Sequence, residues 1–218
     1  MKSKFLWISV LVFFMLALGA FAQEDPKVEA QKAYNEGLGF LKKNQISQAI
    51  PRFKEAVSKD PDLAIAYYAM GIAYKANKDL DNAEVMFKQA IEKDQSLVAA
   101  YNALGLLYSG QDRYDSAVNT FKAALGIDPN YAKANFGLGY VYLHQKDYNN
   151  AIQYFSKAVE IDPDYTKAWE NLGICYHETR QYSEAISAFQ SALEHERKRT
   201  EKGDIYLRLG NAFAKIGD

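Results

Sequence analysis

The pattern of apolar and polar positions repeats along the chain with a period of 34 residues. Four registers keep this step without a slip: Gly37, Gly71, Gly105, Gly139 and Gly173; Ala49, Ala83, Ala117, Ala151 and Ala185; Phe53, Phe87, Phe121, Phe155 and Phe189; and the aromatic residues Phe40, Tyr74, Tyr108, Tyr142 and Tyr176. Chance does not produce four parallel registers. Because a fixed period of this length is typical of stacked identical units, the pattern predicts a repeat architecture and not one wound domain.

Within one repeat the apolar spacing is helical. A first helix carries apolar residues at i, i+3, i+4 and i+7, as in Tyr101, Leu104, Gly105 and Tyr108. A second helix follows, and its predicted buried face is Ala117, Phe121, Ala124 and Leu125. Each unit is therefore a helical hairpin.

Polar residues and prolines predict where the second helix begins and ends. Its N-cap is expected at one shared position of the repeat, occupied by Ser47, Asp81, Asp115, Asn149 and Ser183. Proline lacks the N–H needed to continue a helix, so three second helices should end before Pro61, Pro129 and Pro163.

The small residues predict close approach of the two helices in a hairpin. We expect glycine on the first helix to face alanine on the second, with aromatic rings filling the space beside them. One hairpin cannot bury its apolar face alone, so each hairpin should pack against the next one. The stack should form a superhelix with a concave inner face.

The pattern of Trp169, Leu172, Gly173 and Tyr176, followed by Ala185, Phe189 and Ala192, resembles the tetratricopeptide repeat (TPR). The resemblance covers five full units, 30–63, 64–97, 98–131, 132–165 and 166–199. It implies an all-α fold, a right-handed superhelical solenoid of helix-turn-helix repeats, and a protein that binds other proteins or peptides.

After residue 199 the register slips by three, because Leu209, Gly210 and Phe213 follow Leu172, Gly173 and Tyr176 by 37 residues. We interpret residues 200–218 as the first helix of a partial sixth repeat and expect a longer second helix in unit five. An apolar stripe on the sixth helix would be half covered: Ile205, Tyr206, Leu209, Phe213 and Ile216. This stripe favours a chain that continues, with a plain cap or self-association through the helix as alternatives.

The first residues have the pattern of a bacterial export signal. Lys2 and Lys4 precede an apolar run over residues 5–19, and Ala20-Phe21-Ala22 supplies a small-x-small cleavage site. We predict a signal peptide over residues 1–22, a short linker over 23–29, no membrane span after cleavage, and a periplasmic or extracellular location. The alternative is an uncleaved N-terminal anchor.

Charge and cysteine content narrow the classes of function. The chain has 26 Lys and Arg against 27 Asp and Glu, and loss of Lys2 and Lys4 leaves a net charge of −3. Nucleic-acid binding is therefore not expected, because it needs a basic face. Cys175 is the one thiol, so no intramolecular disulfide is possible; we interpret it as a buried small hydrophobe.

In the tetratricopeptide family, positions 2, 5, 9 and 12 of each unit face the concave groove. The resemblance thus implies these groove residues: Tyr34, Leu38, Tyr68, Ile72, Asn102, Leu106, Phe136, Tyr140, Lys133, Lys167, Glu170 and Ile174. An apolar, tyrosine-rich floor suits peptide capture. The alternative for any one of them is partial burial between neighbouring first helices.

The sequence offers little for catalysis. His144 and His177 on neighbouring first helices, near Glu178, could approach a metal, but no third ligand has fixed spacing and solvated surface histidines are the favoured interpretation. A glycine-rich phosphate loop and a nucleophile with a recognisable base are also missing. We predict no enzyme activity, no cofactor and no metal.

Two hypotheses for function follow. The leading one is a protein-interaction scaffold of the cell envelope, which binds peptide segments or partner proteins in the groove. The alternative is the targeting or substrate-recruiting region of a longer enzyme or receptor, whose working domain would lie beyond residue 218.

Overall fold

A computed structural model describes residues 25–195 and 199–217. The predicted signal peptide, residues 1–22, lies outside these ranges. The described helices are α2 (Pro26–Lys42), α3 (Ile46–Lys59), α4 (Ala64–Ala76), α5 (Leu80–Lys93), α6 (Val98–Ser109), α7 (Tyr114–Ile127), α8 (Ala132–His144), α9 (Tyr148–Ile161), α10 (Thr166–Glu178), α11 (Tyr182–His195) and α12 (Arg199–Ile216). These residues contain no strand, and the predicted all-α class is confirmed.

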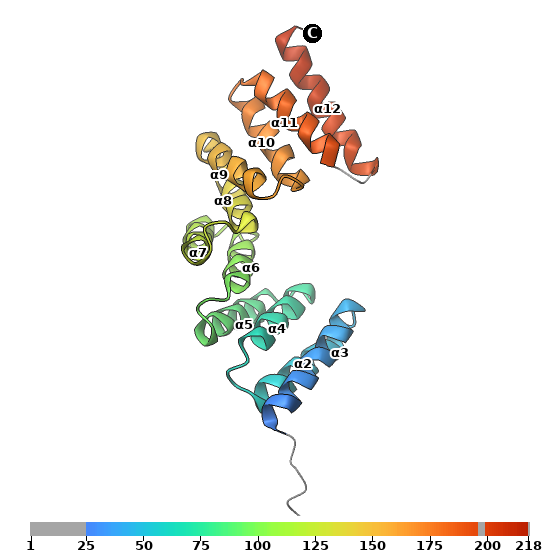
Figure 1. The fold of residues 1–218 in the computed structure, drawn as a ribbon, viewed down its shortest axis with the longest axis vertical. Coiled ribbons are helices and arrows are strands. Elements are labelled where there is room, and N and C mark those ends of the chain that lie inside the picture. The colour runs from blue at the N-terminus through green and yellow to red at the C-terminus, as the bar shows by residue number, and fades with distance from the viewer. Residues whose placement is uncertain (1–24, 196–198, 218) are drawn as a thin grey trace, which may run out of the picture.

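The helices pair in chain order into hairpins. The pairs α2–α3, α4–α5, α6–α7, α8–α9 and α10–α11 pack most closely, and each second helix also packs against the first helix that follows it. In Figure 1 the hairpins follow one another along the long axis, each turned relative to the one before. The chain is thus an elongated superhelical solenoid, as predicted.

Each second helix begins one residue before the predicted N-cap, so that prediction is wrong. The cap lies at the residue before the first helical one. At Asp79 and Asp147, for example, the side-chain carboxylate accepts the backbone N–H three residues on, of Asn82 and Asn150, at 3.2 Å. The helix opens with a large apolar residue, such as Leu80 or Tyr148, so the first polar residue after the turn does not mark its start.

The turn inside each hairpin uses one unusual backbone conformation. Five residues spaced by 34 have a left-handed φ between 57° and 62°: Asn44, Lys78, Asp112, Lys146 and Arg180. Asparagine and aspartate tolerate this region better than lysine or arginine do. The same turn therefore forms in all five hairpins even where the local residue disfavours it, because helix packing dictates it.

The turn between hairpins is held by an aspartate at the end of the second helix. Asp60, Asp94, Asp128 and Asp162 each leave the helix in an extended conformation. Their carboxylates accept the backbone N–H two residues on, at 2.8–3.2 Å. Pro61, Pro129 and Pro163 follow directly, as predicted, and the chain turns into the next first helix.

Glycine in the first helix faces phenylalanine in the second helix of the same hairpin. A Cβ placed on Gly37, Gly71, Gly105, Gly139 or Gly173 would lie 2.6–2.7 Å from the ring of the Phe sixteen residues on. That separation is shorter than real carbon contacts. The expectation that these glycines face alanine is therefore wrong, and the ring is what requires their missing side chain.

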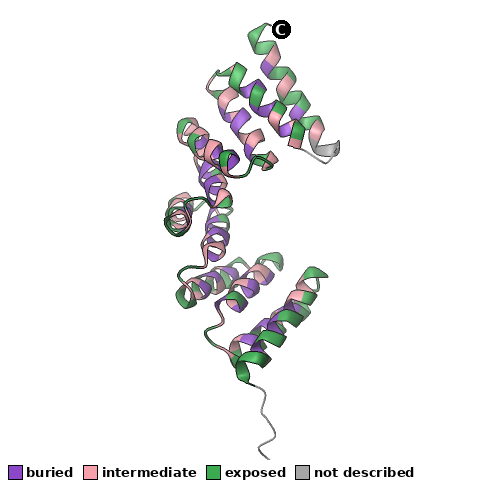
Figure 2. Cartoon of the chain, viewed as in Figure 1, coloured by how far each residue is buried: buried purple, intermediate pink, exposed green. Residues whose placement is uncertain are grey.

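The five phenylalanines are the largest fully buried side chains in the described residues. Phe53, Phe87, Phe121, Phe155 and Phe189 are almost completely buried, and so are the alanines four residues before and three residues after each of them. Figure 2 shows the buried residues on the facing sides of the helices and the exposed ones on the outer sides. Phe121 also touches Gly137 of the next repeat, so one ring joins two units.

A charged cluster joins unit two to unit three. The Glu84 carboxylate on α5 accepts hydrogen bonds from Arg113 at 2.6 Å, Lys88 at 2.7 Å and the Tyr108 hydroxyl at 3.1 Å. The Arg113 guanidinium also lies over the Tyr108 ring, 4.1 Å from its centroid. Burial alone would raise the pKa of Glu84, but these three donors outweigh it and lower the pKa to about 2.

Both ends of the array differ from the predicted boundaries. Helix α2 begins at Pro26, so residues 26–29 are helical and not linker. Helix α11 is described as far as His195, and residues 196–198, where the longer second helix expected in unit five would continue, lie outside the described residues, so that expectation stays a prediction. Helix α12 is described from Arg199, four residues before the position that opens the other first helices.

We predict that Gly71→Ala destabilises the fold by about 1–3 kcal/mol, because its Cβ would overlap the Phe87 ring. Urea unfolding followed by circular dichroism measures this. The control is Gly39→Ala in α2, where a Cβ meets no atom within 4 Å. That change should be neutral or stabilising by up to about 1 kcal/mol. Equal losses in the two variants would contradict the Gly–Phe contact.

We predict that Glu84→Gln costs about 1–3 kcal/mol of unfolding free energy at pH 7, because three donors lose a charged acceptor. The pKa of Glu84 falls from its ordinary value of 4.5 to about 2 on folding, so the stabilisation is complete above the ordinary pKa. It is lost as pH falls from about 5 towards 2. Urea unfolding across that range should show the unfolding free energies of the unmodified chain and of Glu84→Gln converging as the pH falls. A difference between them that does not change with pH would exclude the ionised carboxylate as its cause.

Candidate partner-binding groove

The first helices lie closer to one another than the second helices do. Direct contacts join α2 with α4, α6 with α8, α8 with α10, and α10 with α12, whereas the structure as described has no comparable contact between successive second helices. A stack that is tighter on one side curves towards that side. The first helices therefore line the concave face and the second helices the convex face.

The predicted groove residues differ widely in exposure. Tyr34 and Asn102 are only 8% and 7% exposed, so both belong mainly to the core between helices. Leu106 and Tyr140 are 38% and 37% exposed, and Lys133 and Lys167 are exposed as well. The remainder are half-buried: Leu38, Tyr68, Ile72, Phe136, Glu170 and Ile174.

Leu106 and Tyr140 form the accessible apolar part of the groove. They occupy the same repeat position on α6 and α8, two first helices in direct contact. Ile65 on α4 is also exposed on this face. The sequence analysis did not select Ile65, although it occupies the same repeat position as Lys133 and Lys167 and could have been found from that register.

An aromatic stack fixes the groove floor at α8. The Phe136 ring lies 4.8 Å from Tyr165, 5.5 Å from Phe155 and 6.3 Å from Tyr140, measured between ring centroids. The Tyr140 ring continues to His144 at 4.3 Å. Phe136 is therefore a packed support, while Tyr140 is the member of the stack that reaches solvent.

Tyr131 and Tyr165 extend the tyrosine-rich surface and were missed by the sequence analysis. Both occupy the last position of a repeat, just before a first helix, outside the positions that the resemblance selects. Burial, then the nearby Asp162 and Tyr131, raise the pKa of Tyr165 to about 12. Burial is also the main cause that raises the pKa of Tyr131, and the nearby Tyr68 and Asp128 add smaller contributions. The sequence does contain a pattern that could have identified them: the last position of the repeat is leucine in units one and two and tyrosine in units three and four.

The exposed charges of the groove lie on its C-terminal half. Lys133 on α8 and Lys167 on α10 have no carboxylate within 4 Å in the described ranges. Glu170 is paired instead with Arg208 of α12, at 3.5 Å. Two exposed ammonium groups, unpaired within the described residues, therefore lie on α8, which carries Tyr140, and on the next first helix, α10.

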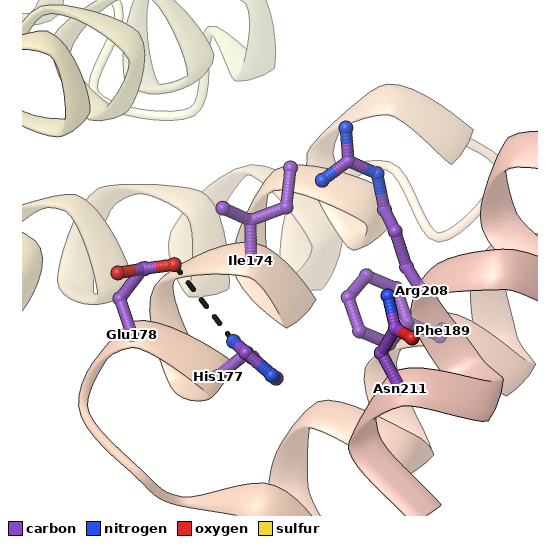
Figure 3. Close-up of a pocket in the computed structure, with 6 residues that line it drawn as sticks. All are labelled: Ile174, His177, Glu178, Phe189, Arg208 and Asn211. Atoms are coloured by element: carbon purple, nitrogen blue, oxygen red, sulfur yellow. Dashed lines mark ion pairs between the residues drawn. The ribbon is translucent and has the colours of Figure 1, made fainter. Parts of the chain in front are cut away.

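A small cavity of about 130 Å³ lies between α10 and α12. Figure 3 shows Ile174, His177 and Glu178 of α10 on one side and Arg208 and Asn211 of α12 on the other, with Phe189 behind. His177 Nδ1 lies 3.8 Å from the Glu178 carboxylate, and His177 Nε2 has no hydrogen-bond partner among the described residues. The cavity is large enough for one side-chain group of a bound segment.

The two histidines weighed as metal ligands pack against different tyrosines. His144 lies beside Tyr140 and Tyr114, and His177 beside Tyr182. Residues 25–195 and 199–217 contain no cluster of three side chains that could hold a metal ion. Cys175 is fully buried, as predicted, and burial followed by the nearby Glu178 raises its pKa to about 12, which leaves an unreactive thiol.

No helix in the described part of the chain combines the length and the apolar character that crossing a membrane requires.

Comparison with protein families identifies the repeat. Tetratricopeptide repeat models match residues 102–166, 142–202 and 64–96, and a TPR repeat model matches residues 37–78. No curated protein matches the sequence.

Solved structures share the fold at low sequence identity. The chain is similar to pilF of Pseudomonas aeruginosa, with a TM-score of 0.78 and 19% identity over 88% of each chain. It is similar to MamA, with a TM-score of 0.66 and 25% identity over 76% of this chain and 96% of MamA. YrrB, described as a TPR protein with an unusual peptide-binding site, has a TM-score of 0.61 and 20% identity over 86% of this chain and 94% of its own.

Proposed function

The chain belongs to the tetratricopeptide repeat family, and from this premise we propose that it is a non-catalytic scaffold of the cell envelope that holds a segment of another protein in its concave groove. Members of this fold bind proteins or peptides, so a protein-interaction role follows from the family itself. The proposal adds the groove residues and the envelope location.

The observation that carries the groove assignment is the exposure of Leu106 and Tyr140 on adjacent first helices. Single exposed apolar residues are common on protein surfaces. Here, however, the two side chains share one repeat position on the concave side, with the half-buried Ile72 one repeat earlier in the same register. An apolar strip on the inner side of a curved array favours binding of an extended peptide, because the bound peptide removes the strip from contact with water.

The polar groups make the two ends of the strip different. Lys133 and Lys167 lie at its C-terminal half, and the cavity between α10 and α12 follows. Tyrosine supplies apolar area and a hydroxyl tip, which is typical of peptide-binding surfaces. We infer that the partner segment places apolar side chains over Leu106 and Tyr140 and polar ones towards α10 and α12.

The envelope location rests on the leader. Lys2 and Lys4, the apolar run and Ala20-Phe21-Ala22 are typical of a cleaved export signal. A scaffold exported in this way would meet other envelope proteins as its partners.

We predict that the double substitution Leu106→Ala and Tyr140→Ala lowers capture of groove partners from envelope extract by about tenfold or more, because two exposed contacts are lost. Quantitative mass spectrometry of proteins retained by the immobilised chain measures this. Both side chains reach solvent, so circular dichroism should show an intact fold.

The matched control is Leu80→Ala with Val85→Ala, two exposed apolar residues on the second helix α5. This control should retain the same partners as the unmodified chain. An unchanged set of partners in the groove variant would refute the groove assignment. Partners retained from cytosolic extract alone would refute the envelope location.

A further inference from the structure

Acidic residues are missing from the central first helices. Helices α4, α6 and α8 contain no Asp or Glu, and their Lys residues are Lys75 in the last turn of α4 and Lys133 in the first turn of α8. Each of the second helices α3, α5, α7, α9 and α11 contains at least one Asp or Glu. Because the whole chain has 27 acidic residues against 26 basic ones, this absence is a property of the concave side and not of the composition.

The two lysines of the groove lack the carboxylate partners that basic residues have elsewhere. Lys133 and Lys167 are exposed at the same repeat position of α8 and α10, and no carboxylate lies within 4 Å of either in the described ranges. By contrast, several basic residues of the second helices pair with a carboxylate: Arg52, Lys59, Lys88, Lys93 and Lys157.

The acids of α10 do not supply the missing charge. Glu170 lies three residues after Lys167, but its carboxylate is directed to Arg208 of α12, with Nε at 3.5 Å. Glu178 is the last residue of α10, and its carboxylate lies 3.8 Å from Nδ1 of His177. The negative charge that would balance Lys133 and Lys167 must therefore come from a bound molecule.

The lysines and the apolar residues form two rows across the first helices. Lys133 and Tyr140 lie on one side of α8, two turns apart, which is about 10 Å along the helix axis. Lys167 and Ile174 repeat this arrangement on α10. Because α8 and α10 are in direct contact, their axes are about 8–10 Å apart, and the row of lysines runs beside the row of apolar side chains.

A segment that crosses the first helices between the two rows would meet both of them. An extended chain directs successive side chains to opposite sides, so one set can reach the apolar row and the other the lysine row. On the premise of the proposed function, we infer that the bound segment is acidic. It alternates apolar residues, which cover Leu106 and Tyr140, with Asp or Glu residues, whose carboxylates pair with Lys133 and Lys167.

The lysines would act mainly on the choice of partner. Exposed ion pairs add little affinity by themselves, so most of the binding free energy comes from the apolar strip. A concave surface with one sign of charge attracts segments of the opposite sign and speeds their association. A basic segment would bring like charges against Lys133 and Lys167 and would be disfavoured.

The test begins with a library of random dodecapeptides displayed on phage, selected on the immobilised chain. Peptides that the variant Leu106→Ala with Tyr140→Ala also retains are removed, which leaves the peptides that depend on the groove. Among these, Asp and Glu should be about twice as frequent as in the starting library or more, and Lys and Arg should be less frequent than in it.

Substitution of the lysines tests the pairing itself. The most enriched peptide, made synthetically with a fluorescein label, is titrated with the purified chain and followed by fluorescence anisotropy. Lys133→Gln with Lys167→Gln should lower its affinity by about threefold to tenfold at low salt, because two exposed ion pairs are lost. This difference should disappear near 1 M NaCl, where the Debye length is about 3 Å. Circular dichroism should show an intact fold, since both side chains are exposed.

The matched control is Lys54→Gln with Lys122→Gln, two exposed lysines of α3 and α7 that also lack a carboxylate within 4 Å in the described part of the chain. It changes the net charge equally and should bind the peptide as the unmodified chain does. A charge exchange completes the set. Lys133→Glu with Lys167→Glu should bind a peptide whose Asp and Glu residues are replaced by Lys more tightly than the original peptide.

The outcomes separate this inference from the groove assignment. Groove-dependent peptides without an excess of Asp and Glu would overturn the inference and leave the groove assignment standing. Equal peptide affinity of the unmodified chain and of Lys133→Gln with Lys167→Gln at low salt would do the same. A library that yields no groove-dependent peptide would refute the groove assignment, and the inference with it.

Discussion

The contact between a glycine and a phenylalanine ring is the constraint on which the rest of the structure depends. It occurs five times, at one place in each hairpin, and the ring is always almost completely buried. A ring this close to the partner helix leaves no room for a Cβ, so the two helices approach as closely as their backbones permit. The hairpin that results is thin and has no dry interior of its own. Its second helix must cover its other side with the first helix of the next repeat.

The groove follows from that stacking. Because successive first helices touch at four of the five steps between units, all but α4 to α6, and successive second helices in the described residues do not come equally close, the array curves and places the first helices inside. Residues on that side are divided between two tasks. Tyr34 and Asn102 fill the space between helices, whereas Leu106 and Tyr140 remain available to a partner. The Glu84 cluster adds a polar link between two units. Arg113, which donates to Glu84, occupies the N-cap position of its second helix, where the neighbouring repeats have aspartate.

Much of the fold could be predicted from the sequence, because a 34-residue period in four registers defines both helices of each unit. The partner of each glycine could not, since spacing along one helix does not say which residue of another helix lies opposite. The predicted helix starts were wrong because the first helical residue, such as Leu80 or Tyr148, is apolar, whereas the prediction rested on polar N-cap residues. In the candidate groove, the register identified the concave side but not exposure, which depends on how closely neighbouring first helices pack. Tyr131 and Tyr165 were not predicted as groove residues because they lie in the turn before a first helix, and the groove positions were defined within the helices.

A double-mutant cycle on Gly71 and Phe87 tests the central contact most directly. The unfolding free energy would be measured for the unmodified chain, for Gly71→Ala, for Phe87→Leu and for the double variant. If the ring is what excludes a Cβ, alanine at position 71 should cost less by about 1 kcal/mol or more once the ring is gone. Strict additivity of the two changes would show that glycine and ring do not meet, and would contradict the account.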